Sequence, residues 1–127
     1  MSHWSTAPTN ITNIEALKDA CTMLGLTIQE NAIARGYQGN RLRADYVIKL
    51  EGPYDVALIK EKDTFSIKAD WWGGHVEKVI GKEGNKIKQA YTAAATVQVA
   101  KAKGYPVEMQ RIDNGDIKLV LKVGAGG

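Results

Sequence analysis

The middle of this chain constrains its fold most, because three short segments there alternate apolar and polar residues. They are residues 46–50, 55–60 and 64–71, and the pairs Gly52-Pro53 and Lys62-Asp63 separate them. A period of two is that of a strand with one buried face, and turns this short join antiparallel neighbours. The sequence therefore predicts an antiparallel meander with one buried face. The last segment places four apolar residues on that face: Phe65, Ile67, Ala69 and Trp71.

A helix and two further strands are expected before this meander. Residues 13–24 carry an apolar stripe at helical spacing, and Thr12 with Glu15 fits a capping box at its start. Gly25 stands where a helix takes a left-handed exit. Residues 2–8 and 27–34 are strand candidates on either side of this helix.

After Trp72 the apolar period changes to that of a helix, which is expected over residues 75–103. Residues 106–112 and 116–123 then predict a hairpin whose turn, residues 113–116, contains the Asn-Gly pair favoured in tight turns. The fold class is α+β: one antiparallel sheet with two helices, the second open to interruption at 81–84. Residues 1–123 are expected to form a single domain, followed by a flexible tail at 124–127.

The composition indicates one soluble globular domain. The chain has 127 residues, of which 44% are hydrophobic and 24% charged, so it can bury a core of its own. No apolar run approaches the roughly 18 residues that span a membrane, and no secretory signal is apparent. The single cysteine, Cys21, lies on the apolar stripe of the first helix and is expected to be a buried thiol. A cytoplasmic location follows as an expectation.

Five short stretches, taken in order, carry a resemblance to a known family. They are MSHWST (1–6), RGYQG (35–39), ADYVI (44–48), GPYD (52–55) and ADWWG (69–73). Together they resemble the small family that includes the conserved hypothetical chloroplast open reading frame thirty-five, with relatives in cyanobacteria, other bacteria and some phages. The likeness covers about residues 1–105. Because that family is a domain of unknown function, the resemblance implies a size and a soluble protein but no reaction.

The stretch VIGKEGNKIK, residues 79–88, resembles the core signature of KH domains, which bind single-stranded nucleic acid. In such a domain a G-x-x-G turn between two helices brings bare backbone close to a phosphate chain. Here the turn would use Gly81 and Gly84, with Lys82, Lys86 and Lys88 around it. Six lysines and two glutamates between residues 77 and 103 give this region a basic excess.

The alternative is a structural helix that is kinked or interrupted at the two glycines. Each glycine inside a helix costs about 1 kcal/mol relative to alanine, so packing would have to offset about 2 kcal/mol. In this interpretation the lysines form a solvated helix face. The residue pattern leaves both interpretations open.

The stretch RGYQGNRLR, residues 35–43, is a second candidate for nucleic-acid binding. Arg35, Arg41 and Arg43 carry guanidinium groups that suit phosphate, and Tyr37 has a ring on which a base could stack. The alternative is a loop between two strands whose arginines face solvent or pair with Asp45.

Trp72 is the candidate anchor for a protein partner, because strand alternation places Trp71 in the core and Trp72 on the other face. A half-buried structural tryptophan is the alternative. His3 and His75 have no partners at metal-ligand spacing, and no cofactor is expected. The strand-end acids are interpreted as turn formers rather than catalytic acids: Asp45, Asp55, Asp63 and Asp70.

These patterns favour a small accessory or adaptor protein, not an enzyme, that binds a protein partner or a second copy of itself. A binder of single-stranded RNA or DNA is the alternative, and an enzyme or binder acting on a phosphorylated small molecule is a distant third. No membrane or metal partner is expected.

Overall fold

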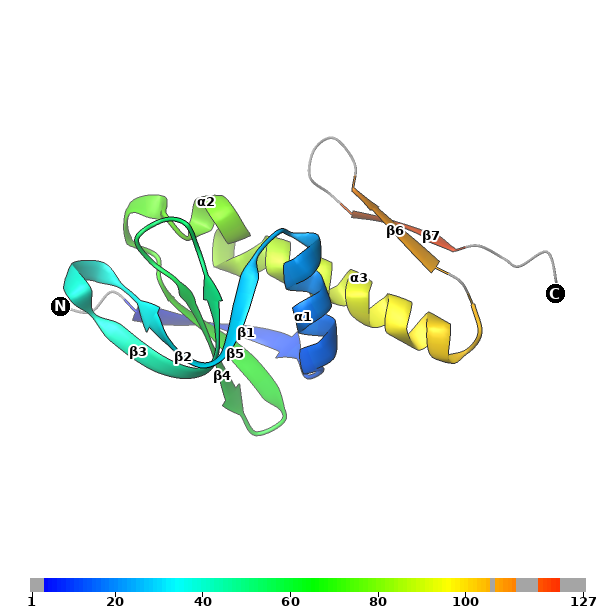
Figure 1. Cartoon of the computed structure of the whole chain (residues 1–127), viewed down its shortest axis with the longest axis horizontal. Helices are drawn as coiled ribbons and strands as arrows, with labels where there is room; N and C mark the ends of the chain where they lie inside the picture. The colour runs from blue at the N-terminus through cyan, green and yellow to red at the C-terminus, as the bar shows by residue number, and fades with distance from the viewer. Residues whose placement is uncertain (1–3, 106, 112–116, 122–127) are drawn as a thin grey trace.

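A computed structural model describes residues 4–105, 107–111 and 117–121 of the chain (Figure 1). It confirms the expected α+β class and the single domain. The strands are β1 (Trp4–Ile11), β2 (Thr27–Arg35), β3 (Arg41–Lys49), β4 (Val56–Glu61), β5 (Thr64–Asp70), β6 (Val107–Arg111) and β7 (Ile117–Leu121). The helices are α1 (Ile14–Met23), α2 (Glu77–Ile80) and α3 (Asn85–Ala102), with short 3-10 turns at Tyr37–Gly39, Trp72–Gly74 and Lys82–Gly84.

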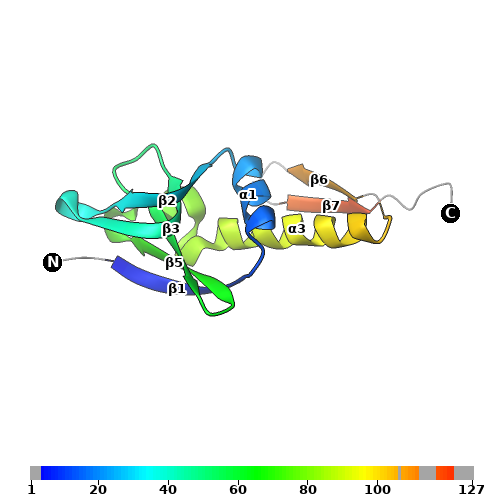
Figure 2. The same cartoon turned by 60° about the horizontal axis from the view of Figure 1, so that its bottom comes forward.

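The main sheet has five antiparallel strands in the order β1-β5-β4-β3-β2. The predicted meander is thus confirmed as β3 to β5. The strand candidate at 27–34 is confirmed as β2, which pairs beside β3, and β1 adds to the other edge beside β5. Strand β3 begins at Arg41, five residues earlier than expected, because it pairs with β2 along the whole length from Arg35↔Arg41 to Thr27↔Lys49. Figure 2 shows α1 and α3 together beside the sheet.

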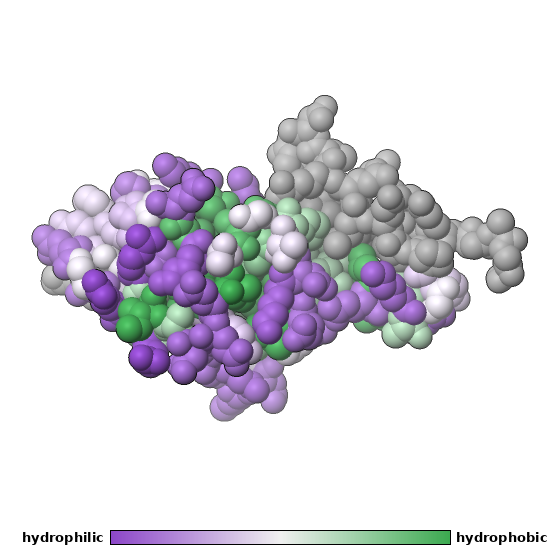
Figure 3. Space-filling model, in the orientation of Figure 1, coloured by the Kyte–Doolittle hydropathy of each residue, from purple (hydrophilic) through white to green (hydrophobic). Residues whose placement is uncertain are grey.

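The core lies between the sheet and the helices. Ile48, Leu58 and Ile67 of the sheet are fully buried there with Leu17 of α1 and Ile87 of α3. The middle of one face shows apolar residues surrounded by hydrophilic ones (Figure 3), where partly buried side chains border this core.

The opposite face of the sheet also buries residues, so the prediction of a single buried face was incomplete. A small cluster there consists of Ala34, Ala44, Val47 and Ala57, with Trp4 packed against it. The ring of Trp4 lies so close to Gly36 that a Cβ on Gly36 would be 2.6 Å from its Cζ2 atom. The start of β1 therefore meets the end of β2, across the full width of the sheet, and this contact requires a glycine.

Helix α1 is capped by Asn13, and the predicted capping box of Thr12 and Glu15 is wrong. The Asn13 Oδ1 atom accepts hydrogen bonds from the N–H groups of Glu15 and Ala16 at 3.0 and 3.2 Å. The N–H groups of Thr12 and Asn13 donate instead to the Tyr91 hydroxyl on α3, both at 3.0 Å. The cap is therefore one residue later than predicted, and the N–H group that Glu15 was expected to accept is satisfied by a tertiary contact. Gly25 leaves the helix at φ +71°, as expected.

The second helical region begins at Glu77 and is interrupted by the turn Lys82–Gly84, so residues 75–103 do not form a single helix. The expected C-terminal hairpin is confirmed as β6 paired with β7, and Figure 1 shows it beside α3. It forms a two-stranded sheet of its own rather than part of the one sheet expected. Its predicted turn at 113–116, the strand end at 122–123 and the expected flexible tail at 124–127 lie outside the described residues.

Candidate partner-binding site

The glycine pair forms a turn between two helices, as the G-x-x-G pattern predicts. Gly81 ends α2 at φ +83° and ψ 170°, and Gly84 precedes α3 at φ +79°. The Gly84 N–H donates to the Gly81 carbonyl oxygen at 3.0 Å and closes the turn. The first conformation is open essentially to glycine alone, and the second strongly favours it. Both glycines are thus required by the backbone itself.

Gly84 faces the core rather than solvent. It is buried, and a Cβ added to it would lie 2.8 Å from Cδ1 of Ile67, a fully buried residue of β5. Its missing side chain therefore lets the start of α3 lie directly on the sheet. A phosphate-binding turn needs backbone without side chains to face the ligand. Here Gly84, one of the two glycines, faces the core instead.

The lysines around the turn do not share one direction. Lys82 and Lys86 are exposed, and the exposed Glu83 lies between them in the chain. Lys88 is half-buried and lines a cleft with Tyr91 and Thr92. Because successive helical residues are about 100° apart, Lys86 and Lys88 point to different sides of α3.

Arg35 is committed to a structural ion pair with Asp55, not with Asp45. Its Nε and Nη2 atoms donate to the two Asp55 carboxylate oxygens at 2.8 and 2.9 Å, and Nη2 also reaches the carbonyl oxygens of Leu50 and Gly52. Burial alone would raise the Asp55 pKa, but hydrogen bonds from Arg35 and from the Leu50 N–H outweigh it and hold the pKa below its ordinary value. The hydrogen bond to Asp55 likewise raises the pKa of Arg35.

The other two arginines of this stretch lie on β3 and are exposed. Arg43 donates to the Asn31 side chain at 3.1 Å. Asp45, the partner expected from the sequence, accepts instead from the Lys60 N–H at 2.8 Å. All three arginines of the predicted cluster are therefore exposed, but the guanidinium of Arg35 is already engaged by Asp55 and by backbone carbonyl oxygens.

Tyr37 and Trp72 meet although 35 positions separate them in the sequence. Their ring centroids are 4.7 Å apart with the planes tilted by 49°, and the Trp72 residue is 49% exposed. Tilted ring pairs at this distance are an attractive geometry. The structure thus brings together two candidates that were predicted separately, and we name Tyr37 and Trp72 the aromatic pair.

Asp70 holds both members of the aromatic pair by their backbone. Its Oδ2 atom accepts from the Tyr37 N–H at 2.9 Å, and its Oδ1 atom accepts from the Trp72 N–H at 3.1 Å. The Asp70 residue is fully buried at the end of β5. A buried carboxylate with both oxygens engaged fixes the two turns relative to each other.

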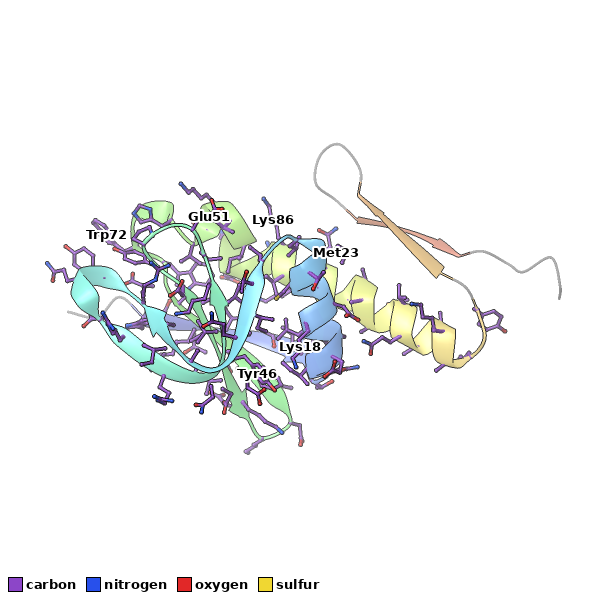
Figure 4. All side chains as sticks on the ribbon, in the orientation of Figure 1. Lys18, Met23, Tyr46, Glu51, Trp72 and Lys86 are labelled. Carbon is purple, nitrogen blue, oxygen red and sulfur yellow. The ribbon has the colours of Figure 1, made fainter. Side chains whose placement is uncertain are left out.

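A further pair of rings, which includes the buried Tyr54, and a cleft are also found in this part of the molecule. Tyr54 and His75 pack edge to face with centroids 5.2 Å apart. A cleft of about 320 Å³ lies between β1 and the glycine turn, lined by Ser5, Thr6, Ala7, Trp71, Glu77, Lys82 and Glu83. Figure 4 shows Trp72 at one end of the molecule and Lys86 well apart from it, so the aromatic pair and this lysine do not form one patch.

Cys21 takes a structural position in the core. Cys21 is fully buried, and burial raises the pKa of its thiol to about 12. Within the described ranges no group of three or more His, Cys, Asp or Glu side chains is placed to hold a metal ion. No helix in the described part of the chain is long and apolar enough to cross a membrane.

Sequence reasoning missed the roles of Asp55 and Asp70. Both were interpreted only as turn formers at strand ends, whereas each is fully buried and joins segments distant in sequence. A signal was present, because Asp70 follows the buried Ala69 directly and precedes two tryptophans. An acid in that place is expensive unless it is hydrogen-bonded.

Comparison with known proteins gives a family but no activity. Residues 20–120 match the model of the family described as protein of unknown function, DUF1257. The chain is also similar to the uncharacterized protein ycf35 of Cyanophora paradoxa, with 27% identity over 124 residues, which are 96% of this chain and 97% of the relative. No solved structure matches it significantly.

Proposed function

This chain belongs to the DUF1257 family, and we propose that it is a non-enzymatic accessory protein of the cytoplasm that binds another protein through the aromatic pair. The observation that carries the proposal is the placement of Trp72, which is half-exposed, packed against the Tyr37 ring and hydrogen-bonded through its backbone N–H to buried Asp70. Tryptophan and tyrosine dominate the energetic centres of protein interfaces.

Rigidity distinguishes the aromatic pair from a tryptophan that is merely exposed. The N–H groups of Tyr37 and Trp72 both end on one buried carboxylate, so neither turn needs to be ordered when a partner docks. Binding usually costs free energy for ordering loops and side chains at the interface. A pair that is fixed beforehand avoids part of that cost and suits a binding anchor.

The test begins with affinity capture from the cells that make the chain. Wild type, Trp72→Ala and Ile33→Ala serve as baits, since Ile33 is the matched control: an exposed apolar residue on β2. A protein retained by wild type and by Ile33→Ala but not by Trp72→Ala is then purified. Its affinity is measured by isothermal titration calorimetry at low and high salt.

We expect Trp72→Ala to weaken this binding by about 2 kcal/mol or more, roughly 30-fold, with Ile33→Ala close to wild type. The dissociation constant should change little with salt, because an apolar anchor releases few counterions. A partner that binds Trp72→Ala as tightly as wild type would rule out the aromatic pair as its anchor. Circular dichroism confirms that each variant is folded.

Single-stranded nucleic acid is the second candidate, favoured by one observation. The glycine turn does lie between two helices, with Lys82 and Lys86 exposed beside it. Against it stand the packing of Gly84 on Ile67, the exposed Glu83 and the commitment of Arg35 to Asp55.

A fluorescent random single-stranded RNA, titrated with the protein across a salt series, separates the two candidates. The accessory-protein proposal predicts no binding tighter than about 10⁻⁴ M at physiological salt, the weak end of non-specific affinities. Salt-sensitive binding that Lys82→Glu abolishes, with the fold intact, would favour the nucleic-acid function instead.

A further inference from the structure

A second surface lies on α3, which in Figures 1 and 4 extends away from the end of the molecule where Trp72 lies. An open groove of about 570 Å³ follows this helix. Its lining residues are Tyr91, Thr92, Ala95, Thr96, Val99, Ala100, Lys103 and Tyr105. Val99 and Tyr105 are 55% and 54% exposed, two of the four large apolar residues that are exposed within residues 4–105.

The two threonine hydroxyls that line the groove already have hydrogen-bond partners within the protein. The Thr92 hydroxyl donates to the Lys88 carbonyl oxygen at 3.0 Å, and the Thr96 hydroxyl donates to the Thr92 carbonyl oxygen at 2.7 Å. Since both hydroxyls are satisfied by their own helix, an apolar surface can cover this face without leaving them unpaired. Such a face suits the apolar side of another element.

Charge decides which element fits. Helix α3 and its C-cap residue Lys103 carry four lysines and no acidic residue. Lys88 precedes the groove and lines a neighbouring cleft of about 310 Å³, which shares Tyr91 and Thr92 with the groove. Lys103 lines the groove near its other end. A second copy of α3 would bring lysines against lysines at both ends, whereas carboxylates would meet a cation at each.

We propose that this groove binds an amphipathic helix of a partner protein, with an apolar face over Thr92 to Val99 and acidic residues near Lys88 and Lys103. Fifteen positions separate the two lysines, so the docked helix spans about 22 Å, or about four turns. This surface is independent of the aromatic pair and adds a second contact to the chain.

The test uses two synthetic helical peptides of about 16 residues that share one apolar face and carry either glutamate or lysine at both flanks. Fluorescence anisotropy reports their binding to the full chain. We expect the acidic peptide to bind at least about tenfold more tightly than the basic one. Val99→Glu should abolish its binding, and the control Ile33→Glu, at a residue on β2, should not.

The lysines of α3 provide a matched charge control on a single helix. Lys88→Glu with Lys103→Glu reverses the charges that bracket the groove, and Lys86→Glu with Lys101→Glu makes the same change in net charge at lysines that do not line it. The first pair should reverse the peptide preference, so that the basic peptide binds better. The second pair should leave the preference for the acidic peptide in place.

Three results would overturn the proposal: no binding of the acidic peptide at about 1 mM protein, equal binding of both peptides, or binding that Val99→Glu leaves unchanged. Anionic lipid vesicles and sedimentation equilibrium are run alongside. If Val99→Glu abolishes vesicle binding or self-association while the acidic peptide does not bind, the groove serves a membrane or a second copy instead. Trp72→Ala should leave peptide binding unchanged, so failure here is distinct from failure at the aromatic pair.

Discussion

Replacing Gly84 by alanine tests whether the glycine turn is built for packing. The new Cβ would lie 2.8 Å from Ile67 Cδ1, and the backbone would keep φ at +79°. A left-handed conformation costs a residue other than glycine about 1–2 kcal/mol. Overpacking adds about 1 kcal/mol, the low end of its usual range, because the contact is with a terminal methyl group. We therefore expect Gly84→Ala to lower the free energy of unfolding by about 2–3 kcal/mol.

Gly25→Ala is the control that isolates the packing part. Gly25 has φ +71°, and nothing lies within 4 Å of a Cβ built on it. Its replacement should show the backbone cost alone, about 1–2 kcal/mol, so that Gly84→Ala should exceed it by about 1 kcal/mol. Urea unfolding followed by circular dichroism gives both values, and equal m-values confirm that the same transition is compared.

A double variant tests the contact itself. Ile67→Val removes the Cδ1 atom that the new Cβ would strike, at a cost of about 0.5–1.5 kcal/mol by itself. The double variant Gly84→Ala with Ile67→Val should then be more stable than the sum of the two single changes predicts, by about 1 kcal/mol. If Gly84→Ala costs no more than Gly25→Ala, or if the two changes simply add, the turn does not rest on the sheet and its glycines are open to a ligand.

Three further predictions follow from buried groups. Asp55→Asn should lower the free energy of unfolding by about 2–3 kcal/mol at pH 7, less than for a fully enclosed pair because the Arg35 side chain is 45% exposed. Since the Asp55 pKa is lowered in the fold, this contribution is fully present above the unfolded pKa and is lost as the pH falls through the folded pKa. The gap in urea unfolding between wild type and variant should therefore narrow as the pH falls below about 4, and a gap that stays constant between pH 5 and pH 2 contradicts it. Cys21, with its pKa raised to about 12, should resist iodoacetamide at pH 8 until urea unfolds the chain, and fast labelling of the native protein would show that the thiol is accessible. Asp70→Asn leaves one carbonyl oxygen for the N–H groups of Tyr37 and Trp72. It should weaken binding of the captured partner by about tenfold, which is less than the effect of Trp72→Ala. Unchanged affinity by calorimetry would show that Asp70 does not position the aromatic pair.

Much of the fold could be predicted from local patterns. The meander was specified by strict alternation between short turns, and the interruption of the second helical region was foreshadowed by Gly81 and Gly84. The cap of α1 was misplaced by one residue because the Asn13 side chain, not that of Thr12, accepts the first N–H groups of the helix, and the Thr12 N–H donates to the Tyr91 hydroxyl, 79 positions away, rather than to Glu15. Asn13 is itself a preferred N-cap residue, so a local signal for the cap was present, whereas the approach of Tyr91 has none.

The candidate site shows the same limit. Tyr37 and Trp72 were each identified as a candidate, but their stacking depends on how the sheet brings the end of β2 toward the end of β5. Likewise, Arg35 resembled a free cation in sequence, and only the long-range approach of Asp55 shows it to be structural. Patterns along the chain predict which residues bear chemistry, whereas the sheet decides which of them meet.

Photo-crosslinking beside the aromatic pair tests the central claim most directly. A benzophenone amino acid replaces Gln38, the exposed neighbour of Tyr37, or replaces Lys62 in the β4–β5 turn as a control. Irradiation of living cells should yield a discrete protein adduct from position 38, absent from position 62 and lost when Trp72→Ala is added. Adducts with RNA alone, or a protein adduct that survives Trp72→Ala, would contradict the proposal that Tyr37 and Trp72 anchor a protein partner.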